Sequence, residues 1–340
     1  MSRVVAVMIT ILALPFAAAG LVLVAGAAAS LVIALRVGAE YPPAGPFVDV
    51  TGGRLATIQA GPADGPPIIL LHGASANASD PMEGVGRRLA EKGFRVIAFD
   101  RPGFGWSDRI AGGAAAAPAV QARAISEALE RLRLGPVLVF GHSWAGALAL
   151  ALALDHPAQV AGLVLAAPVA MPMPPRMLAL PWYWRLALRP PVAWILSRTI
   201  GPPLARSYLS EAARRVFLPQ PETPGYPEAA RAALVLRPGT LLANVQDLIG
   251  LPAALAAQSP RYGQLHVPTV VISGEADPIV RSDTQAVPLA KAIPGARLVL
   301  LPGTGHMLQY VASERLTEEV VRLWDALSAA RPALAPAVAR

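Results

Sequence analysis

The sequence has no cysteine, and this absence removes several kinds of protein from consideration. A disulfide scaffold, a zinc site built from thiolates and a cysteine nucleophile are all excluded. Charged residues are also scarce, at 15% of the chain against a usual value of about 25%. Hydrophobic residues, in contrast, make up 54% of the 340 residues, which is too much apolar surface for a disordered chain. The length fits one large domain, or a domain with an insertion.

Charge is absent from the N-terminal segment, where an uncharged run of 32 residues extends from Val4 to Leu35. A helix needs about 20 apolar residues to cross a bilayer, so this run is long enough for a transmembrane anchor. A cleaved signal peptide is the alternative, because the small residues at 26–30 could be cut, but its apolar region is typically only about 7–15 residues long. We therefore expect a retained transmembrane helix over residues 1–36 and a linker over residues 37–46. The protein would then be single-pass in a membrane such as the bacterial inner membrane, with the side of its soluble part left open.

The remainder of the chain alternates short apolar runs with helical patterns. A hairpin is expected from strands at 47–50 and 54–60, and buried strands are expected at 68–71, 94–99, 137–140, 160–165, 269–273 and 297–301. Helical patterns lie between or after them, at 118–134, 144–156, 282–293 and 313–330. This alternation predicts an α/β fold with a mostly parallel sheet and helices on both faces. We assign residues 47–167 and 267–330 to this core and residues 331–340 to a tail.

A segment of about a hundred residues, 168–266, separates two of these strands, far more than the usual connection of about 2–6 residues. We expect it to form a helical cap or lid over the core. Its first part is rich in proline and carries four aromatic residues, Trp182, Tyr183, Trp184 and Trp194. These side chains could pack on the core, line a binding cleft or touch lipid. We take Trp182 and Trp184 as candidate substrate contacts.

The cap also carries most of the net charge. It has ten arginines, no lysine and four acidic residues, or +6, while the rest of the chain has 19 basic and 18 acidic residues, or +1. A basic face can attract nucleic acid or anionic lipid. No nucleic-acid-binding motif accompanies it, so we expect no nucleic-acid partner. Arginine usage driven by the base composition of the gene explains the excess equally well.

The strongest local signal for chemistry surrounds Ser143. A buried strand over 137–140 leads into Gly141-His142-Ser143-Trp144-Ala145-Gly146 and then into a helix. A serine on such a sharp strand-to-helix turn has an exposed hydroxyl, as in a nucleophile elbow, and the small residues at 141 and 145 let strand and helix approach each other. An ordinary turn that happens to contain a serine is the alternative.

A serine hydroxyl needs a base to take its proton, and the base needs a carboxylate to orient it. His306 follows the last strand in a glycine-rich loop, and Asp277 comes just after the strand at 269–273. The carboxyl ends of parallel strands meet at one edge of the sheet, so both can reach Ser143. Glu275 and Asp283 are weaker candidates for the acid. We expect His142, which is adjacent to the serine, to point elsewhere.

Two backbone N–H groups are needed to stabilise the negative oxygen that forms during acyl transfer. One is expected from Trp144, which follows the candidate nucleophile. The other is expected from Ala74, in the loop that begins His72-Gly73 after the strand at 68–71. We expect His72 to shape this loop and not to act as a base.

With these motifs in order, the chain resembles the α/β-hydrolase superfamily, in particular its lidded serine hydrolases with a His-Gly oxyanion loop. The matching motifs are His72-Gly73, the DRPGFGWS stretch at 100–107, GHSWAG at 141–146, GEAD at 274–277 and Gly305-His306. The resemblance covers about residues 47–328 and leaves the N-terminal helix outside. In such proteins the loop at 100–107 is a structural turn beside the site. In dehalogenase and epoxide-hydrolase relatives the nucleophile is an aspartate, often followed by tryptophan; with Ser143 here, an alkyl-enzyme ester is not expected.

The resemblance implies a serine hydrolase that cleaves small lipophilic ester-type substrates through an acyl-enzyme. Ser143, His306 and Asp277 would form the triad, Ala74 and Trp144 the oxyanion hole, and no metal or organic cofactor would be required. A carbon–carbon bond hydrolase and a cofactor-free perhydrolase use the same triad and stay open as alternatives. An aminopeptidase would need acidic residues in the cap, which is basic. A missing triad member would favour a non-catalytic binding protein, but all three are present. The sequence does not indicate an oligomeric state.

Overall fold

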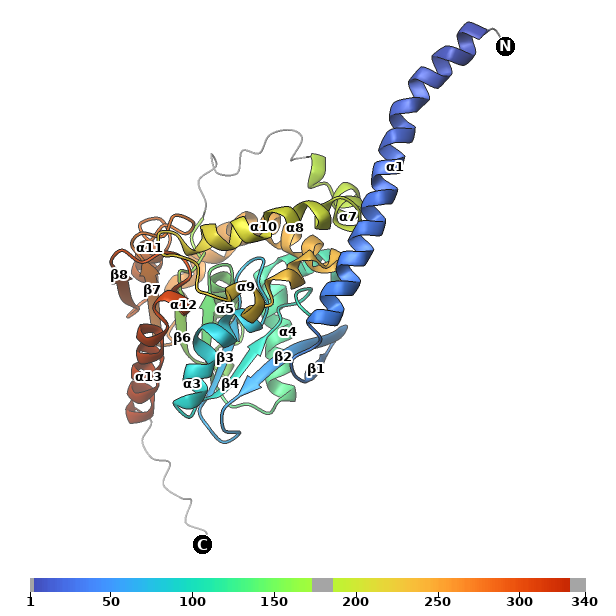
Figure 1. Ribbon diagram of the computed structural model, residues 1–340. Coiled ribbons are helices and arrows are strands. Elements are labelled where there is room, and N and C mark those ends of the chain that lie inside the picture. Colours follow the sequence, from blue (N-terminus) through green and yellow to red (C-terminus); the bar gives the residue numbers. More distant parts are fainter. Residues whose placement is uncertain (1–2, 173–185, 331–340) are drawn as a thin grey trace.

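The computed structural model describes residues 3–172 and 186–330 (Figure 1). Eight strands form one sheet in the order β1-β2-β4-β3-β5-β6-β7-β8. Their bounds are β1 Phe47–Val50, β2 Gly53–Ala60, β3 Pro67–Leu71, β4 Arg95–Phe99, β5 Val137–His142, β6 Val160–Ala166, β7 Thr269–Gly274 and β8 Arg297–Leu301. The pairs β1–β2 and β2–β4 are antiparallel, and all other pairs are parallel. The predicted fold class, a mostly parallel sheet that begins with a hairpin, is confirmed.

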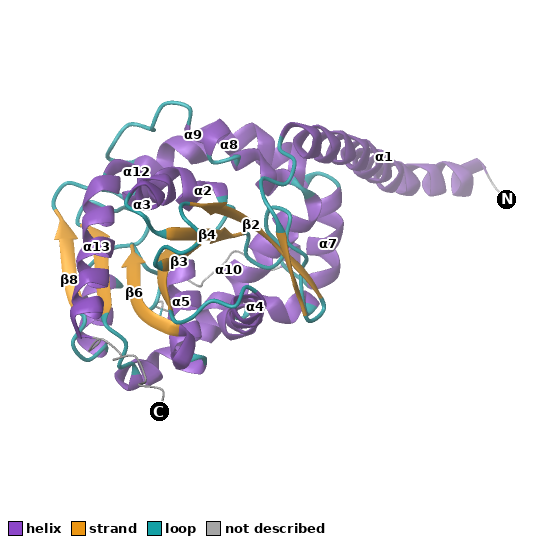
Figure 2. Cartoon of the chain, turned by 90° about the horizontal axis from the view of Figure 1, so that it is seen from below, coloured by secondary structure: helices purple, strands orange, loops and turns teal. Residues whose placement is uncertain are grey.

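Helices cover both faces of the sheet because alternate side chains of each strand point to opposite faces. Ile69 and Leu71 of β3 belong to a buried cluster with α4 (Pro118–Arg131), α5 (Ala145–Asp155) and α11 (Ala286–Ala292). Ile68 and Leu70 belong to a second cluster, with η1 (Met82–Gly86), α3 (Arg87–Glu91) and α13 (Ser313–Ala330). Figure 2 shows these two layers on either side of the strands. Short helices α2 (Ser79–Pro81) and α12 (Leu308–Val311) complete the second layer.

The described part of the segment between β6 and β7 is helical and lies over the carboxyl edge of the strands (Figure 1). It contains α7 (Pro190–Arg198), α8 (Gly201–Phe217), α9 (Tyr226–Ala229), η5 (Ala232–Leu236), α10 (Pro238–Gln258) and η6 (Ser259–Gln264). We call this segment the cap. The helical cap insertion expected from the sequence is therefore present.

The N-terminal part of helix α1 (Arg3–Glu40) projects away from the rest of the molecule, while its C-terminal part packs on it (Figure 1). It is one of two described helices that are long and apolar enough to cross a membrane; the other is α10, a cap helix. The expected linker over residues 37–46 is wrong in its first part, because α1 continues to Glu40. Ile33 and Val37 are buried against Leu234 and Leu236 of η5, so packing on the cap extends the helix past the apolar run.

The turn between β5 and α5 leaves no room for a side chain at Gly141. A Cβ atom there would lie 2.7 Å from the carbonyl oxygen of Ala145 and 3.1 Å from the Cβ of Ala149. The strand and the helix thus approach each other as closely as glycine and alanine permit. This close approach explains why small residues stand at 141 and 145.

We predict that Gly141→Ala destabilises the fold by about 1–3 kcal/mol, because the added methyl group forces β5 and α5 apart. Thermal and urea unfolding would measure the change. Gly135→Ala is the matched control, since no atom lies within 4 Å of its added Cβ. Equal stability of the two variants would contradict the argument.

Candidate active site

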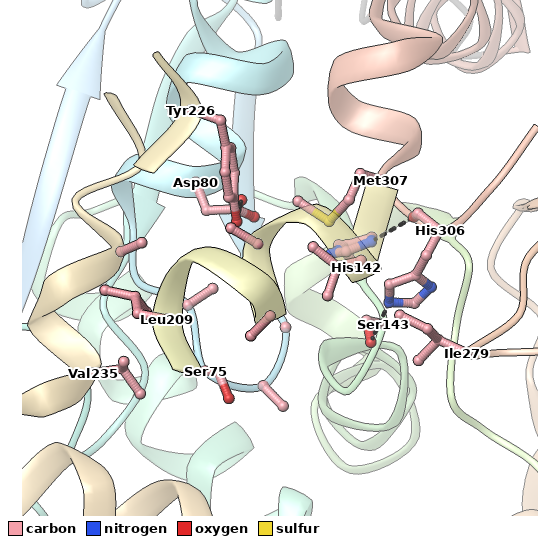
Figure 3. Close-up of a pocket in the computed structure, with 17 residues that line it drawn as sticks. Ser75, Asp80, His142, Ser143, Leu209, Tyr226, Val235, Ile279, His306 and Met307 are labelled. Atoms are coloured by element: carbon pink, nitrogen blue, oxygen red, sulfur yellow. Dashed lines mark hydrogen bonds between the residues drawn. The ribbon is translucent and has the colours of Figure 1, made fainter. Parts of the chain in front are cut away.

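Three side chains predicted to act together meet at the carboxyl edge of the sheet, and Figure 3 shows two of them, Ser143 and His306. Ser143 follows β5, Asp277 follows β7 and His306 follows β8. His306 Nε2 lies 3.1 Å from Ser143 Oγ, and His306 Nδ1 lies 2.7 Å from Asp277 Oδ2. All three residues are at least nine-tenths buried. The structure therefore brings Ser143 together with two residues that are more than a hundred positions away in the chain.

The backbone of Ser143 has φ of +54°, in the left-handed region that non-glycine residues seldom adopt. Hydrogen bonds on both sides hold it there. Its N–H donates to the carbonyl of Ala166 at 3.0 Å, and its carbonyl accepts from the N–H groups of Gly146 and Val169, both at 2.9 Å. This conformation directs the hydroxyl out of the turn, as expected of an elbow.

Asp277 is fixed by its own turn. Its Oδ1 accepts the N–H groups of Ile279 and Val280, at 2.8 and 2.9 Å. Its Oδ2 remains to accept Nδ1–H of His306. That bond selects the tautomer in which Nε2 of His306 is unprotonated, so Nε2 can accept the hydroxyl proton of Ser143.

The two backbone N–H groups predicted to face a reacting oxygen lie beside Ser143. Across the described chain, neither Ala74 N–H nor Trp144 N–H donates to a protein acceptor. A Cβ on Gly73 would lie 3.1 Å from the Cβ of Ser143, so the loop carrying Ala74 passes directly against the serine. Cap residue Asn244 holds this loop, because its Oδ1 accepts Ser75 N–H at 2.8 Å and its Nδ2 donates to Ser75 Oγ at 2.9 Å.

Comparison with known proteins agrees with this fold. A family model described as alpha/beta hydrolase fold matches residues 66–313, more than half of the chain. The chain belongs to the α/β-hydrolase fold family. The expected membership of that superfamily is confirmed.

Relatives within this family carry different names. A haloalkane dehalogenase of Mycobacterium marinum is 30% identical over 292 residues, covering 83% of this chain and 94% of that protein. The 2-hydroxymuconate semialdehyde hydrolase of Pseudomonas putida is 30% identical over 271 residues, covering 78% and 90%. The structure of a thermophilic esterase from Thermogutta terrifontis has a TM-score of 0.65 at 24% identity, covering 83% of this chain and 98% of that one, and shows the fold alone. The protein is thus a hydrolase of α/β fold, and the bond it cleaves is a separate question.

His142 has a supporting place in this α/β hydrolase. Its ring lies beside that of His306, with centroids 4.9 Å apart, and its Nε2–H donates to the backbone carbonyl of His306 at 3.1 Å. Burial lowers the pKa of His142 to about 3, so the ring is neutral at physiological pH. The sequence predicted that His142 points away from Ser143. The hydrogen bond from His142 to the backbone of His306 was not predicted, because it joins residues that are far apart in the chain.

Arg101 joins the cap to the loop that carries Ala74. Its guanidinium is fully buried and donates to the carbonyl oxygens of His72 and Gly73, at 3.0 and 3.2 Å. It also pairs with Asp247 of α10 at 2.6 Å. The ring of Trp144 stacks on it, with the guanidinium carbon 4.0 Å from the ring centroid. Burial lowers the pKa of Arg101 to about 10, which leaves it charged at neutral pH.

His72 shapes the same loop, as expected. Its Nδ1–H donates to the carbonyl of Gly73 at 2.8 Å, and its Nε2 accepts Arg101 N–H at 3.0 Å. Both ring nitrogens are therefore occupied by the backbone. Burial and the nearby Arg101 charge lower the pKa of His72 well below its usual value, so it stays neutral.

We predict that Asp247→Asn lowers the free energy of unfolding by about 3–5 kcal/mol, because it leaves the buried Arg101 charge without its counterion. Asp283→Asn, which breaks the exposed pair with Arg281, is the control and should change stability by less than about 1 kcal/mol. Chemical denaturation measures both. Comparable effects at the two sites would show that the buried pair is not a cap-to-core link.

A pocket of about 260 Å³ opens beside Ser143 and His306. Its cap side is formed by Leu209, Ala212, Ala213 and Val216 of α8, Tyr226 of α9, and Ala232 and Val235 of η5. Trp182 and Trp184, predicted as substrate contacts, lie outside the described residues. Trp194 does not line the pocket and is 53% exposed. Aliphatic side chains of α8 thus provide much of the described cap wall, and no motif in the sequence marked them.

Asp80 is a buried carboxyl group in the wall of this pocket. Its Oδ2 accepts from Gln309 Nε2 at 3.0 Å, and its Oδ1 lies 3.4 Å from the hydroxyl of Tyr226. Both partners are neutral, so burial dominates and raises the pKa of Asp80 to about 6. No local pattern in the sequence marks this group, since a single acidic residue after a loop is common. Within residues 3–172 and 186–330, no three ligand-type side chains are grouped so that they could hold a metal ion.

We predict that Asp80 makes stability depend on pH. A folded-state pKa above the unfolded value means that the native protein holds the proton more tightly, so this group's contribution to the free energy of unfolding decreases from about pH 4 to about pH 6. Asp80→Asn removes this decrease. Relative to wild type, the variant should therefore gain on the order of 3 kcal/mol over that interval.

Denaturant unfolding at several pH values would measure the difference between the two proteins. Other titrating groups, such as His142, are common to both and cancel. Asp49→Asn, at an exposed position of β1, is the control. A difference between Asp80→Asn and wild type that is the same at pH 4 and pH 7 would contradict the prediction.

Proposed function

We propose that this protein is a membrane-anchored serine hydrolase that cleaves lipophilic ester-type acyl substrates through an acyl-enzyme. The observation that carries the proposal is the line of contacts Asp277–His306–Ser143 beside two N–H groups without protein acceptors. A hydroxyl, a base oriented toward it and N–H donors for a negative oxygen are the requirements of acyl transfer. The mostly aliphatic pocket supports a lipophilic acyl group.

In the proposed reaction, Ser143 Oγ attacks the carbonyl carbon while its proton moves to His306 Nε2. The N–H groups of Ala74 and Trp144 donate to the resulting oxyanion. When the bond to the alcohol breaks, His306 gives its proton to the departing alkoxide, which leaves an ester on Ser143. Water then attacks this ester with His306 as base, and the products are a carboxylic acid and free Ser143. Asp277 stays ionised and stabilises the protonated ring.

The similarity to a haloalkane dehalogenase does not favour dehalogenation here. An aspartate nucleophile forms an alkyl ester that water can hydrolyse, whereas displacement of a halide by Ser143 would leave an alkyl ether with no carbonyl for water to attack.

A carbon–carbon bond hydrolase is the stronger second candidate, because the similar P. putida hydrolase covers 78% of this chain. A cofactor-free perhydrolase on the same three residues also stays open.

The membrane anchor rests on α1. The most apolar 18-residue stretch within Ala13–Glu40 has a mean hydropathy of 2.4, and only 11% of it is buried. Exposing such an apolar surface to water is unfavourable in free energy, whereas a bilayer would cover it.

We predict that a fluorophosphonate probe labels the wild type and fails to label Ser143→Ala. Turnover of p-nitrophenyl esters should fall by about three or more orders of magnitude in the same variant, because its nucleophile is missing. Ser210→Ala, at an exposed position of α8, is the matched control and should keep both properties.

A series of acyl chain lengths and a brominated alkane, tested in parallel, would separate the substrate classes. Persistent labelling of Ser143→Ala would refute the assignment of the nucleophile. Halide release from the alkane, with no ester turnover, would replace the proposed reaction by the dehalogenase chemistry.

A further inference from the structure

The cap carries a surface of exposed apolar side chains mixed with arginines. We call it the cap patch, and it comprises Trp194, Ile195, Ile200, Leu204 and Tyr208 together with Arg189, Arg198 and Arg206. Residues 186–210 contain no acidic residue. Across the described part of the chain, none of these three arginines forms a salt bridge. An apolar surface with uncompensated positive charge is typical of a helix face that lies in a membrane interface.

The contact between α1 and the cap sets the position of the cap patch along the axis of α1. Side chains 13–25 of α1 are exposed, and no atom lies within 4 Å of a Cβ added at Gly20. At Gly26 the helix is close to the cap, because a Cβ there would lie 3.1 Å from Ile200 Cγ2 and from the backbone carbon of Thr199. The stretch Arg3–Ala25 would be about 35 Å long at 1.5 Å per residue. A bilayer core is about 30 Å thick. We call this stretch, Arg3–Ala25, the free part of α1. Its length therefore matches the thickness of a bilayer core, and the junction of α7 and α8 lies next to its C-terminal end.

Figure 1 shows α7 beside α1, with the free part of α1 extending past the cap on its outer side. Helix α8 has two functional faces in this arrangement. Leu209, Ala213 and Val216 line the pocket, while Leu204 and Tyr208 are exposed, at 56% and 63%. The guanidinium of Arg198 lies 4.3 Å from the ring centroid of Trp194. The cap patch thus holds an aromatic ring and a positive charge side by side, a pair that could face lipid headgroups.

We propose that the cap patch docks on the anionic surface of the same bilayer that holds α1, so that lipophilic substrate reaches the pocket from the lipid side. This proposal rests on the proposed membrane anchor. Arginines complement anionic headgroups, and Trp194, Ile195, Leu204 and Tyr208 enter the region just below them. Since α1 already fixes the cap beside the bilayer, docking requires no separate recruitment of the protein.

The absence of native cysteine permits a direct test with single-cysteine variants of the full chain. Each variant is labelled with an environment-sensitive fluorophore and reconstituted in nanodiscs of phosphatidylcholine and phosphatidylglycerol, with or without brominated acyl chains. Ile195→Cys probes the cap patch, and Leu14→Cys probes the free part of α1. Arg131→Cys is the negative control, because Arg131 ends α4 at the opposite edge of the sheet and its side chain is 66% exposed.

We expect brominated lipid to quench the labels at positions 14 and 195 to a similar extent and to leave the label at 131 unchanged. Exchanging phosphatidylglycerol for phosphatidylcholine, or replacing Arg189, Arg198 and Arg206 by glutamine, should reduce quenching at 195 and not at 14.

Each other outcome identifies its own failure. Quenching at 14 alone would overturn docking and leave the anchor intact. No quenching at 14 would overturn the anchor, and docking with it. A label at 195 that is shielded from water but insensitive to bromine would mean that a protein, such as a second copy of this chain, covers the cap patch, and this also overturns the proposal.

Discussion

The buried contact between Arg101 and Asp247 is the interaction on which the geometry of the site depends. Burying a guanidinium costs several kcal/mol unless its charge and donors are matched. Here Asp247 supplies the counterion from α10, two carbonyl groups of the His72–Gly73 loop accept from the same group, and the ring of Trp144 covers one face. The cap, the loop with Ala74 and the turn at Ser143 are therefore linked at one point. A shift of α10 would move the N–H of Ala74 relative to Ser143, so the cap is part of the site and not a detachable cover.

Much of the core could be predicted from the sequence because its signals are local. Six strands were expected because each is a continuous apolar run, and the first two because they flank a hairpin turn. All eight lie within a few residues of their expected bounds. The meeting of Ser143, Asp277 and His306 could be predicted because each comes soon after a strand, and the fold brings those strand ends together. Asp80, Asn244 and the α8 wall of the pocket were not found. Each acts through contacts with residues far away in the chain, and no local pattern encodes such contacts.

The N-terminal helix illustrates a different limit of sequence analysis. A run of apolar residues has the same composition whether lipid or protein covers it, so the expected anchor extended to residue 36 without a division. In the structure Gly26 divides α1, because the missing side chain lets the backbone approach Thr199 and Ile200. Beyond it, Ser30, Ile33 and Val37 are buried, and Ile33 and Val37 pack in the cluster with Val235. Val235 also lines the pocket. The second half of α1 thus supports the outer wall of the pocket, a role that hydropathy alone cannot reveal.

The spacing of residues on α8 connects this wall to the question of substrate access. Positions 209, 213 and 216 recur at intervals of four and three, so they share one helical face, the one turned toward Ser143. Positions 204 and 208 are also four apart, but they share an exposed face. Alanine at 213 and 212 keeps the inner face short, which leaves space for a ligand between α8 and the serine. A single helix therefore separates the pocket from the cap patch. A lipophilic substrate that leaves a bilayer at that surface would have only the width of α8 to pass. It would then contact the aliphatic α8 side chains that line the pocket.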